Sequence, residues 1–387
     1  MDKVDEILDR GVVNAIPDRN SLEKALRSGK RLSVYMGIDP TATRIHLGHA
    51  VPLRKLQTLS ELGHNVTFLI GDFTALIGDA SDKDSERPIL TGEEIRRNFK
   101  TYQKQAEKVL DFSKVSVRYN SSWLKKIRFE EILKLAQHFS VGDFVGRKLI
   151  RERLTSGKRV RLDETLYPVM QGYDSFFMDT DLQIGGADQT FNMQAGRVLQ
   201  KDLRDKESFI LVTDYLTGTD GRKMSKSWGN AIWIADSAGE MYGKVMSIND
   251  SLIGKYFELA TKLTFAEIDA QMKIFEKGDH LSVKEFLALT ITSEHHGREV
   301  AQRAQNEFNN TFRKGKPKFD KPWVLKKGAS VSDLVSEYVG SKSEAKRKIA
   351  EGAIDVDSKT ATDPNFKLEG GERVKIGKRL FVKVVAK

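Results

Sequence analysis

Residues 32–70 read LSVYMGIDPTATRIHLGHAVPLRKLQTLSELGHNVTFLI, and this stretch decides the fold. Its first seven residues are apolar and partly alternating, which predicts a strand closed by an Asp-Pro-Thr turn. A helix is expected over residues 45–62, with Gly63 at the usual C-terminal stop position. The continuously apolar run 66–70 then predicts a buried parallel strand. Strand, helix and strand at this length indicate a βαβ unit.

The same kind of pattern continues toward residue 228. Thr91 and Glu94 form a capping box that opens another helix, and short apolar runs predict strands at 115–117, 182–186 and 209–213. Residues 1–228 are therefore expected to form a doubly wound, Rossmann-like α/β domain with a parallel sheet. Ligands of such a domain bind at the carboxyl ends of the strands.

The pattern changes after residue 228. Residues 229–316 are expected to form a helical domain, and a basic, proline-containing linker is expected at 317–325. Residues 326–387 predict a separate small α+β domain. Within it, a helix begins at Ser341 and short strands follow. The whole chain carries a net charge of +10, and residues 326–387 hold 14 basic against 9 acidic side chains. Half of the basic excess therefore lies in this last domain, which favours a polyanionic partner.

Composition narrows the class of protein further. The chain contains no cysteine, which excludes disulfides, thiolate catalysis and cysteine-based zinc sites, and fits a reducing compartment such as the cytoplasm. No apolar run approaches the roughly 20 residues that a membrane-spanning helix needs. The first six residues lack the basic and then apolar layout of a signal peptide.

The segment His46-Leu47-Gly48-His49 places two imidazoles on one face of the first turn of the expected helix. A helix N-terminus attracts phosphate, and imidazoles there can donate to the phosphates of a nucleotide. Gly48 removes a side chain where a base or ribose must come close. The alternative interpretation, without a function, is two partly exposed histidines on an amphipathic helix.

A second motif, Lys223-Met224-Ser225-Lys226-Ser227, follows on a loop after a predicted strand. Lys223 and Lys226 could close over a triphosphate and neutralise charge that appears only in the transition state. A solvated basic loop is the simpler interpretation of this motif alone. The sequence contains neither a G-x-G-x-x-G nor a G-x-x-x-x-G-K-[ST] motif, and no clustered pattern predicts a metal held by the protein.

In this order and separation, the two motifs resemble the paired signatures of the class I aminoacyl-tRNA synthetases. Three further segments resemble the bacterial tyrosyl-tRNA synthetases: YMGIDPT at 35–41, YPVMQGYD at 167–174 and QIGGADQ at 183–189. The resemblance covers nearly the whole chain. It implies a tyrosine–tRNA ligase that activates L-tyrosine with ATP, releases pyrophosphate and transfers tyrosine to the 3′ end of tRNA(Tyr).

The resemblance also implies roles for individual residues. Those that match the family's catalytic positions are His46, His49, Lys223, Lys226, Thr41, Lys83 and Arg87. Those that match its tyrosine-binding positions are Tyr35 and Asp174 at the phenol hydroxyl, and Asp79, Tyr167 and Gln171 at the α-ammonium. Those expected to bind ATP or the adenylate are Asp39, Gly48, Gly186, Asp188, Gln189 and Lys226. A phenol and a carboxylate can pair a substrate hydroxyl as donor and acceptor at once.

Three positions depart from the family's commonest pattern. Ala80 and Asp82 stand where proline and a second glycine are usual, which affects the rigidity of the loop that carries Lys83. Ala187 stands where serine or threonine is usual.

The helix opened by Ser341 resembles part of the small RNA-binding domain that these synthetases share with a ribosomal small-subunit protein. Its cations Lys342, Lys346, Arg347 and Lys348 are expected to contact RNA phosphates, although a solvated basic helix is the alternative. The resemblance further implies Mg²⁺ carried by ATP and a homodimer.

Three other functions are weighed against this one. A tryptophanyl-tRNA synthetase would need neither the Tyr35 and Asp174 pair nor the terminal module. A small-molecule adenylyltransferase would leave the last 160 residues without a role. A non-enzymatic RNA-binding paralogue would be expected to have lost His46, His49 or the loop lysines.

Overall fold

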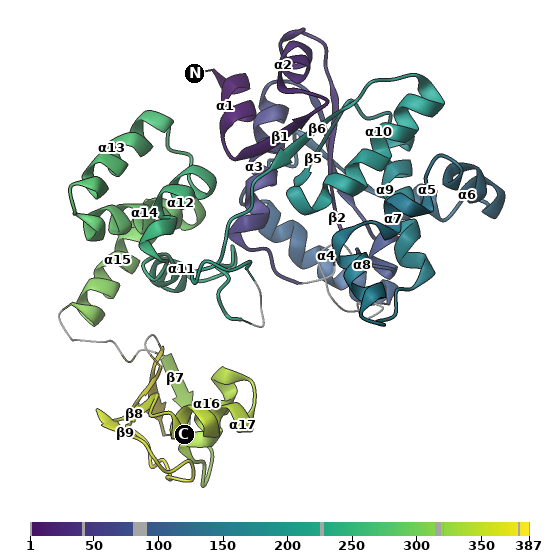
Figure 1. Cartoon of the computed structure of the whole chain (residues 1–387). Coiled ribbons are helices and arrows are strands. Elements are labelled where there is room, and N and C mark those ends of the chain that lie inside the picture. The colour runs from purple at the N-terminus through teal and green to yellow at the C-terminus, as the bar shows by residue number, and fades with distance from the viewer. Residues whose placement is uncertain are drawn as a thin grey trace. The chain divides into compact units, whose positions relative to one another are not determined.

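The computed structural model describes residues 2–40, 43–79, 91–224, 228–313, 319, 321–377 and 380–386. The chain divides into two compact units (Figure 1). The first comprises residues 1–237 and 244–295, and the second comprises residues 238–243 and 296–387.

The first unit contains a six-stranded sheet in the order β1-β6-β5-β2-β3-β4. Strands β2 to β6 run parallel, and β1 pairs antiparallel with β6 at one edge. The bounds are β1 Val12–Ile16, β2 Ser33–Ile38, β3 Asn65–Ile70, β4 Val115–Tyr119, β5 Leu182–Gly186 and β6 Phe209–Thr213. The prediction of a doubly wound parallel sheet is confirmed, while β1 was not predicted.

Helices connect these strands, and further helices follow β6 (Figure 1). Those within the first unit are α1 Lys3–Asp9, α2 Arg19–Arg27, α3 Leu47–Glu61, α4 Gly92–Ala106, α5 Ser121–Leu124, α6 Phe129–Ala136, α7 Val141–Val145, α8 Lys148–Thr155, α9 Leu162–Phe177, α10 Thr190–Arg204, α12 Ile253–Ala260 and α13 Phe265–Glu276. Helices α11 (Ala238–Val245) and α14 (His280–His296) each have residues in both units. Within the described ranges, no helix is long and apolar enough to cross a membrane.

The predicted capping box at the start of α4 is confirmed. The Thr91 hydroxyl accepts from the Glu94 backbone N–H at 3.3 Å, and the Thr91 backbone N–H donates to the Glu94 carboxylate at 2.8 Å. These bonds satisfy N–H groups that a helix leaves without partners in its first turn.

Strand β2 occupies the point that matters for function. It lies between β3, which follows it in the chain, and β5, which follows much later. The connections on its two sides therefore leave in opposite directions, and a crevice opens at the carboxyl ends of the strands.

The second unit contains α15 (Arg298–Phe312) and a five-stranded sheet in the order β7-β11-β10-β8-β9. Its remaining elements are β7 Lys321–Val324, α16 Val331–Val339, α17 Lys342–Ala350, β8 Ile354–Val356, β9 Lys359–Thr360, β10 Arg373–Ile376 and β11 Leu380–Val385. The sequence placed 317–325 in a linker, whereas residues 321–324 form β7 and pair in parallel with β11. The predicted boundary after residue 228 stays a prediction.

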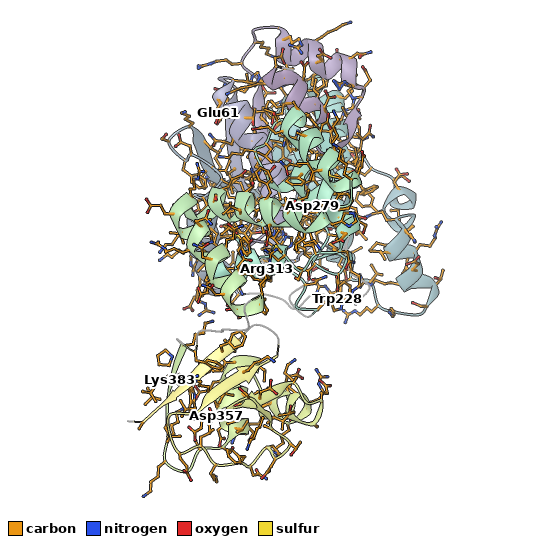
Figure 2. The ribbon with its side chains drawn as sticks, turned by 90° about the vertical axis from the view of Figure 1, so that its left-hand side faces the viewer. Glu61, Trp228, Asp279, Arg313, Asp357 and Lys383 are labelled. Atoms are coloured by element: carbon orange, nitrogen blue, oxygen red, sulfur yellow. The ribbon has the colours of Figure 1, made fainter. Side chains whose placement is uncertain are left out.

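The small sheet and its two helices enclose one apolar core. Trp323, Leu334, Ile349, Val374 and Val382 are buried in it. The tight turn after β8 is made by Asp357 and Ser358 at φ of 47° and 69°, a backbone conformation that aspartate tolerates better than most residues (Figure 2 labels Asp357). The shared apolar core therefore holds the small sheet and its two helices together although the segment is short.

Candidate active site

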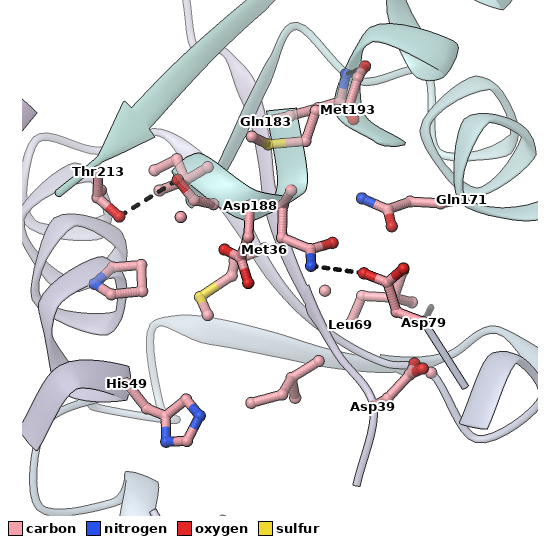
Figure 3. A pocket seen from close by; sticks show the side chains of 18 of the residues that line it. Met36, Asp39, His49, Leu69, Asp79, Gln171, Gln183, Asp188, Met193 and Thr213 are labelled. Atoms are coloured by element: carbon pink, nitrogen blue, oxygen red, sulfur yellow. Dashed lines mark hydrogen bonds between the residues drawn. The ribbon is translucent and has the colours of Figure 1, made fainter. Parts of the chain in front are cut away.

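A cavity of about 310 Å³ opens where the parallel strands of the first unit end. Its walls come from β2 and β5, from the segments after β3 and β6, and from α3 and α9. Figure 3 shows side chains such as Met36, Asp79 and Gln183 around it. The position is the one expected for ligands of a doubly wound sheet.

Most of the predicted site residues line this cavity. They are Tyr35, Asp39, His46, Gly48, His49, Asp79, Tyr167, Gln171, Asp174, Gly186, Asp188, Gln189 and Lys223. Thr41, Lys83, Arg87 and Lys226 lie outside the described residues. Segments as far apart as residues 35 and 223 therefore meet at one cavity, as the two sequence motifs require.

Tyr35 and Asp174 are both buried at the cavity wall. The Tyr35 hydroxyl donates to Gln183 Oε1 at 3.0 Å. Asp174 accepts from Trp123 Nε1 at 2.7 Å and from Asn120 Nδ2 at 3.0 Å. Burial raises the pKa of Asp174 to about 7, against those hydrogen bonds, and burial followed by the charge of Asp174 raises the pKa of Tyr35.

A second polar group surrounds Asp79, which is itself buried. Its Oδ2 accepts from Gln189 at 2.8 Å and from Asn192 at 3.1 Å, and Arg147 lies 3.8 Å from its Oδ1 (Figure 3 labels Asp79). Gln171 extends from α9 into the cavity, and within the described residues its side chain makes no hydrogen bond. These groups form a polar wall suited to an ammonium group.

Tyr167 belongs to the same wall. Its hydroxyl donates to Asp39 Oδ2 at 2.9 Å, and the Thr74 hydroxyl donates to Asp39 Oδ1 at 2.7 Å. Asp39 directly follows β2, so the end of the central strand is linked to α9 and to the segment after β3.

The two histidines of the first motif lie at the start of α3. His46 is the N-cap residue, and its imidazole stacks on that of His49 with centroids 3.7 Å apart. The backbone N–H of His46 donates to His49 Nδ1 at 3.3 Å, which leaves the proton of a neutral His49 on Nε2.

Both histidines are held neutral. Burial, then His49, then Lys223 lower the pKa of His46 to about 2, while burial and Lys223 lower that of His49 to about 4. Lys223 is thus close enough to act electrostatically on both rings, which joins the two motifs in space. Its ammonium also lies 3.8 Å from Asp188 Oδ2.

Two glycines keep the backbone near this end of the cavity free of side chains. A Cβ at Gly48 would lie 3.0 Å from His46 Nδ1, and one at Gly186 would lie 2.8 Å from Asp188 Oδ1. Any side chain at either position would displace the group beside it.

Several lining or supporting residues were not predicted as site residues. Gln183, Asn120, Trp123 and Arg147 hold Tyr35, Asp174 and Asp79, and Tyr102 of α4 also lines the cavity. Gln183 begins the QIGGADQ segment but was assigned no role there, and no motif marks the other four positions. Polar residues within apolar runs, such as Gln183 within 182–186, were the one available signal.

The predicted RNA-binding cations lie on α17 in the second unit. Lys342 pairs with Asp333 at 2.9 Å, Arg347 with Glu344 at 2.7 Å, and Lys348 lies 3.7 Å from Glu344. Lys346 is exposed on the same helix. Their roles stay predictions.

A family model described as tRNA synthetases class I (W and Y) matches residues 27–313. The chain therefore belongs to this family of class I synthetases.

Curated relatives narrow the assignment within the family. The tyrosine–tRNA ligase of Carboxydothermus hydrogenoformans is 42% identical and covers 98% of this chain and 97% of its own length. That of Thermotoga maritima is 40% identical, with 98% and 96% covered. These relatives place the chain among the tyrosine–tRNA ligases.

Solved structures agree on the fold. A C-terminally truncated mitochondrial tyrosyl-tRNA synthetase of Aspergillus nidulans superposes with a TM-score of 0.68 at 23% identity and covers 80% of this chain and 94% of its own. The tyrosyl-tRNA synthetase of Archaeoglobus fulgidus, complexed with L-tyrosine, gives a TM-score of 0.61 at 21% identity, with 79% and 100% covered. At these identities the likeness establishes the class I fold alone.

Proposed function

We propose that this chain activates L-tyrosine with ATP to tyrosyl-adenylate and pyrophosphate, and then transfers the tyrosyl group to the 3′ end of tRNA(Tyr). One observation carries the proposal. The buried pair Tyr35 and Asp174 lines the same cavity as His46, His49 and Lys223. A single cavity thus offers groups for a phenol and groups for a triphosphate.

In this proposal the phenol hydroxyl of tyrosine donates to Asp174 and accepts from Tyr35. Asp174 is already held by Asn120 and Trp123, whereas the single hydroxyl proton of Tyr35, which Gln183 Oε1 accepts in this structure, turns to the substrate when it binds. Asp79, Tyr167 and Gln171 receive the α-ammonium. A substrate without the hydroxyl would leave the Asp174 carboxylate buried without this partner, which is costly.

At the other end of the cavity, the substrate carboxylate attacks the α-phosphorus of ATP and pyrophosphate leaves. The neutral His49 donates through Nε2, and His46 lies beside it at the helix N-terminus, where partial positive charge favours phosphate. Lys223 neutralises negative charge that grows on the leaving group, together with Lys226, Lys83 and Arg87. The Thr41 hydroxyl donates to the γ-phosphate. Asp39, Gly48, Gly186, Asp188 and Gln189 receive the ribose and the adenylate. Positioning and charge stabilisation drive the step, and no covalent enzyme intermediate forms.

ATP brings Mg²⁺ with it in this proposal. Within the described ranges, no group of three or more His, Asp or Glu side chains could hold a metal ion. In this proposal the phosphates of ATP are the main ligands of the ion, and the ion supplies charge neutralisation on them.

The RNA partner is assigned to the cations of the second unit and to the helical segment 229–316. Lys342, Lys346, Arg347 and Lys348 on α17 would contact phosphates of tRNA(Tyr). Location in the cytoplasm, where charged tRNA is used, belongs to the same proposal.

A homodimer is also part of the proposal. Apolar side chains that a lone subunit leaves exposed gather on α6, α7, α8 and the start of α9: Phe129, Leu133, Val141, Leu154 and Leu162. Exposed apolar groups in such number favour a subunit interface. A monomer at micromolar concentration in light scattering would contradict this.

The test is exchange of labelled pyrophosphate into ATP, which needs no RNA. Tyrosine should support exchange, while phenylalanine and tryptophan should support little. Exchange that depends equally on tryptophan would favour a tryptophanyl enzyme, and exchange that needs none of the three amino acids would favour another adenylyltransferase.

A further inference from the structure

Tyr215 stands out at the mouth of the cavity. It lies two residues after β6, lines the cavity, and yet 58% of it is exposed. Large aromatic rings normally bury most of their surface on folding. An exposed ring at the rim of a site that handles a nucleotide is available to another flat group.

The position of this ring is fixed by its neighbours. The backbone N–H of Tyr215 donates to Asp214 Oδ1 at 2.7 Å, and Asp214 is ion-paired with Lys255 at 2.8 Å. The Lys255 ammonium lies 5.2 Å from the centroid of the Tyr215 ring. A ring held with a cation above it and much of its surface exposed offers both a stacking surface and a positive charge.

The proposed reaction requires a nucleobase at such a place. The cavity measures about 310 Å³, at the lower end of the range for small-molecule sites, so the adenylate occupies much of it. The terminal ribose of the RNA must reach the activated carboxyl group, while its base has to stay outside. Bases of single-stranded ends are usually held by stacking on aromatic side chains.

We propose that Tyr215 stacks on the 3′-terminal base of the acceptor RNA and thereby positions its ribose for the transfer step. Lys255 assists by orienting the ring and by presenting positive charge to the RNA backbone. The proposal rests on the proposed function and adds to it a group that serves the second step alone.

A similar ring and cation pair lies further along the chain. Trp228 is 52% exposed, and the Arg222 guanidinium lies 4.5 Å from its ring centroid (Figure 2 labels Trp228). Trp228 does not line the cavity, so its truncation is expected to affect transfer less than that of Tyr215.

The test separates the two steps in the full-length protein. Tyr215→Ala should leave tyrosine-dependent pyrophosphate exchange within about twofold of the unmodified protein. Single-turnover transfer from preformed tyrosyl-adenylate to tRNA(Tyr) should fall roughly 5- to 150-fold, the usual cost of losing one base–aromatic stack. Tyr215→Phe keeps the ring and should restore transfer. Tyr119→Ala removes another partly exposed tyrosine that does not line the cavity, and it should leave transfer unchanged.

Two results would overturn the proposal. Transfer at the normal rate in Tyr215→Ala would show that no base stacks there. An equal loss of exchange and transfer would mean that the ring serves ATP or the adenylate instead. Failure of the proposed function itself is distinguishable, because the unmodified protein would then lack tyrosine-dependent exchange.

Discussion

The cavity of the first unit and helix α17 of the second unit use charge in opposite ways. In the cavity, Asp174 is 2% exposed and is held by two buried donors. On α17, the Lys342 side chain is 72% exposed and meets Asp333 in an exposed ion pair. One region keeps its polar groups away from water, and the other keeps them in it.

This contrast teaches what each region can do. Burial raises the pKa of Asp174 to about 7 and lowers that of His49 to about 4. The protonation states of these buried groups therefore depend strongly on their immediate surroundings. The α17 cations instead meet their partners at the surface, where salt weakens the interactions of charged groups. The contrast supports the proposal that chemistry takes place in the first region and that the second attracts a polyanion reversibly.

The largest expected effect comes from a substitution in the cavity of the first unit. His49→Ala removes a neutral donor at the start of α3, and tyrosine-dependent pyrophosphate exchange should fall by about 10²- to 10³-fold in kcat, as for loss of one preorganised donor. Tyrosine binding, measured by calorimetry, should hardly change because Tyr35 and Asp174 remain.

His138→Ala is the matched control. His138 is a more exposed histidine that lies 2.8 Å from Asp202 and does not line the cavity. It should leave exchange unchanged. If His49→Ala weakened tyrosine binding as much as exchange, the assignment of this residue to ATP would be wrong.

A smaller effect follows from pH. Because the pKa of Asp174 is raised from 3.8 to about 7, the free protein holds this proton up to neutral pH, and the group's contribution to the free energy of unfolding falls as pH rises through that window. Tyrosine donates to the ionised carboxylate, so binding must release the proton. Its affinity should therefore drop by up to about tenfold for each pH unit below 7.

Calorimetry between pH 5 and 8 checks this dependence. Asp174→Asn cannot ionise and should bind tyrosine weakly but without this slope. The two histidines do not contribute, since their pKa values of about 2 and 4 keep them neutral over the whole range. An affinity of the unmodified protein that stays flat from pH 5 to 8 would contradict the role of Asp174.

Sequence predicted most of the first region because its strands are continuous apolar runs and its helices carry explicit caps. Strand β1 was not predicted because Val12–Ile16 alone carries no signal for its pairing with β6. Strand β7 was not predicted because its four-residue run contains Pro322, which weakens the strand signal, and because its partner strand β11 lies 61 positions later in the chain.

The candidate site divides in the same way. The residues proposed to touch a ligand fall in motifs, so the place of Tyr35, His49 and Asp174 at the cavity could be predicted. Gln183 and Asn120 only hold those residues, and their role appears once the sheet brings together segments far apart in the chain. Short motifs therefore identify chemistry, while the groups that orient it depend on the assembled fold.

The smallest expected effect tests the second region. Within the described part of the chain Lys346 makes no ion pair, in contrast to its neighbours on α17, so its charge is the most available to RNA. Lys346→Gln should make the log–log dependence of tRNA(Tyr) affinity on salt shallower by about 0.7 to 0.9, the slope for one phosphate contact. Between 50 and 200 mM salt this amounts to about threefold in affinity.

Lys24→Gln on α2, another exposed lysine, should leave the slope unchanged, and pyrophosphate exchange should be unaffected by either variant. An unchanged slope in Lys346→Gln would mean that α17 is a solvated basic helix. The exposed charges of the second region would then not serve RNA binding.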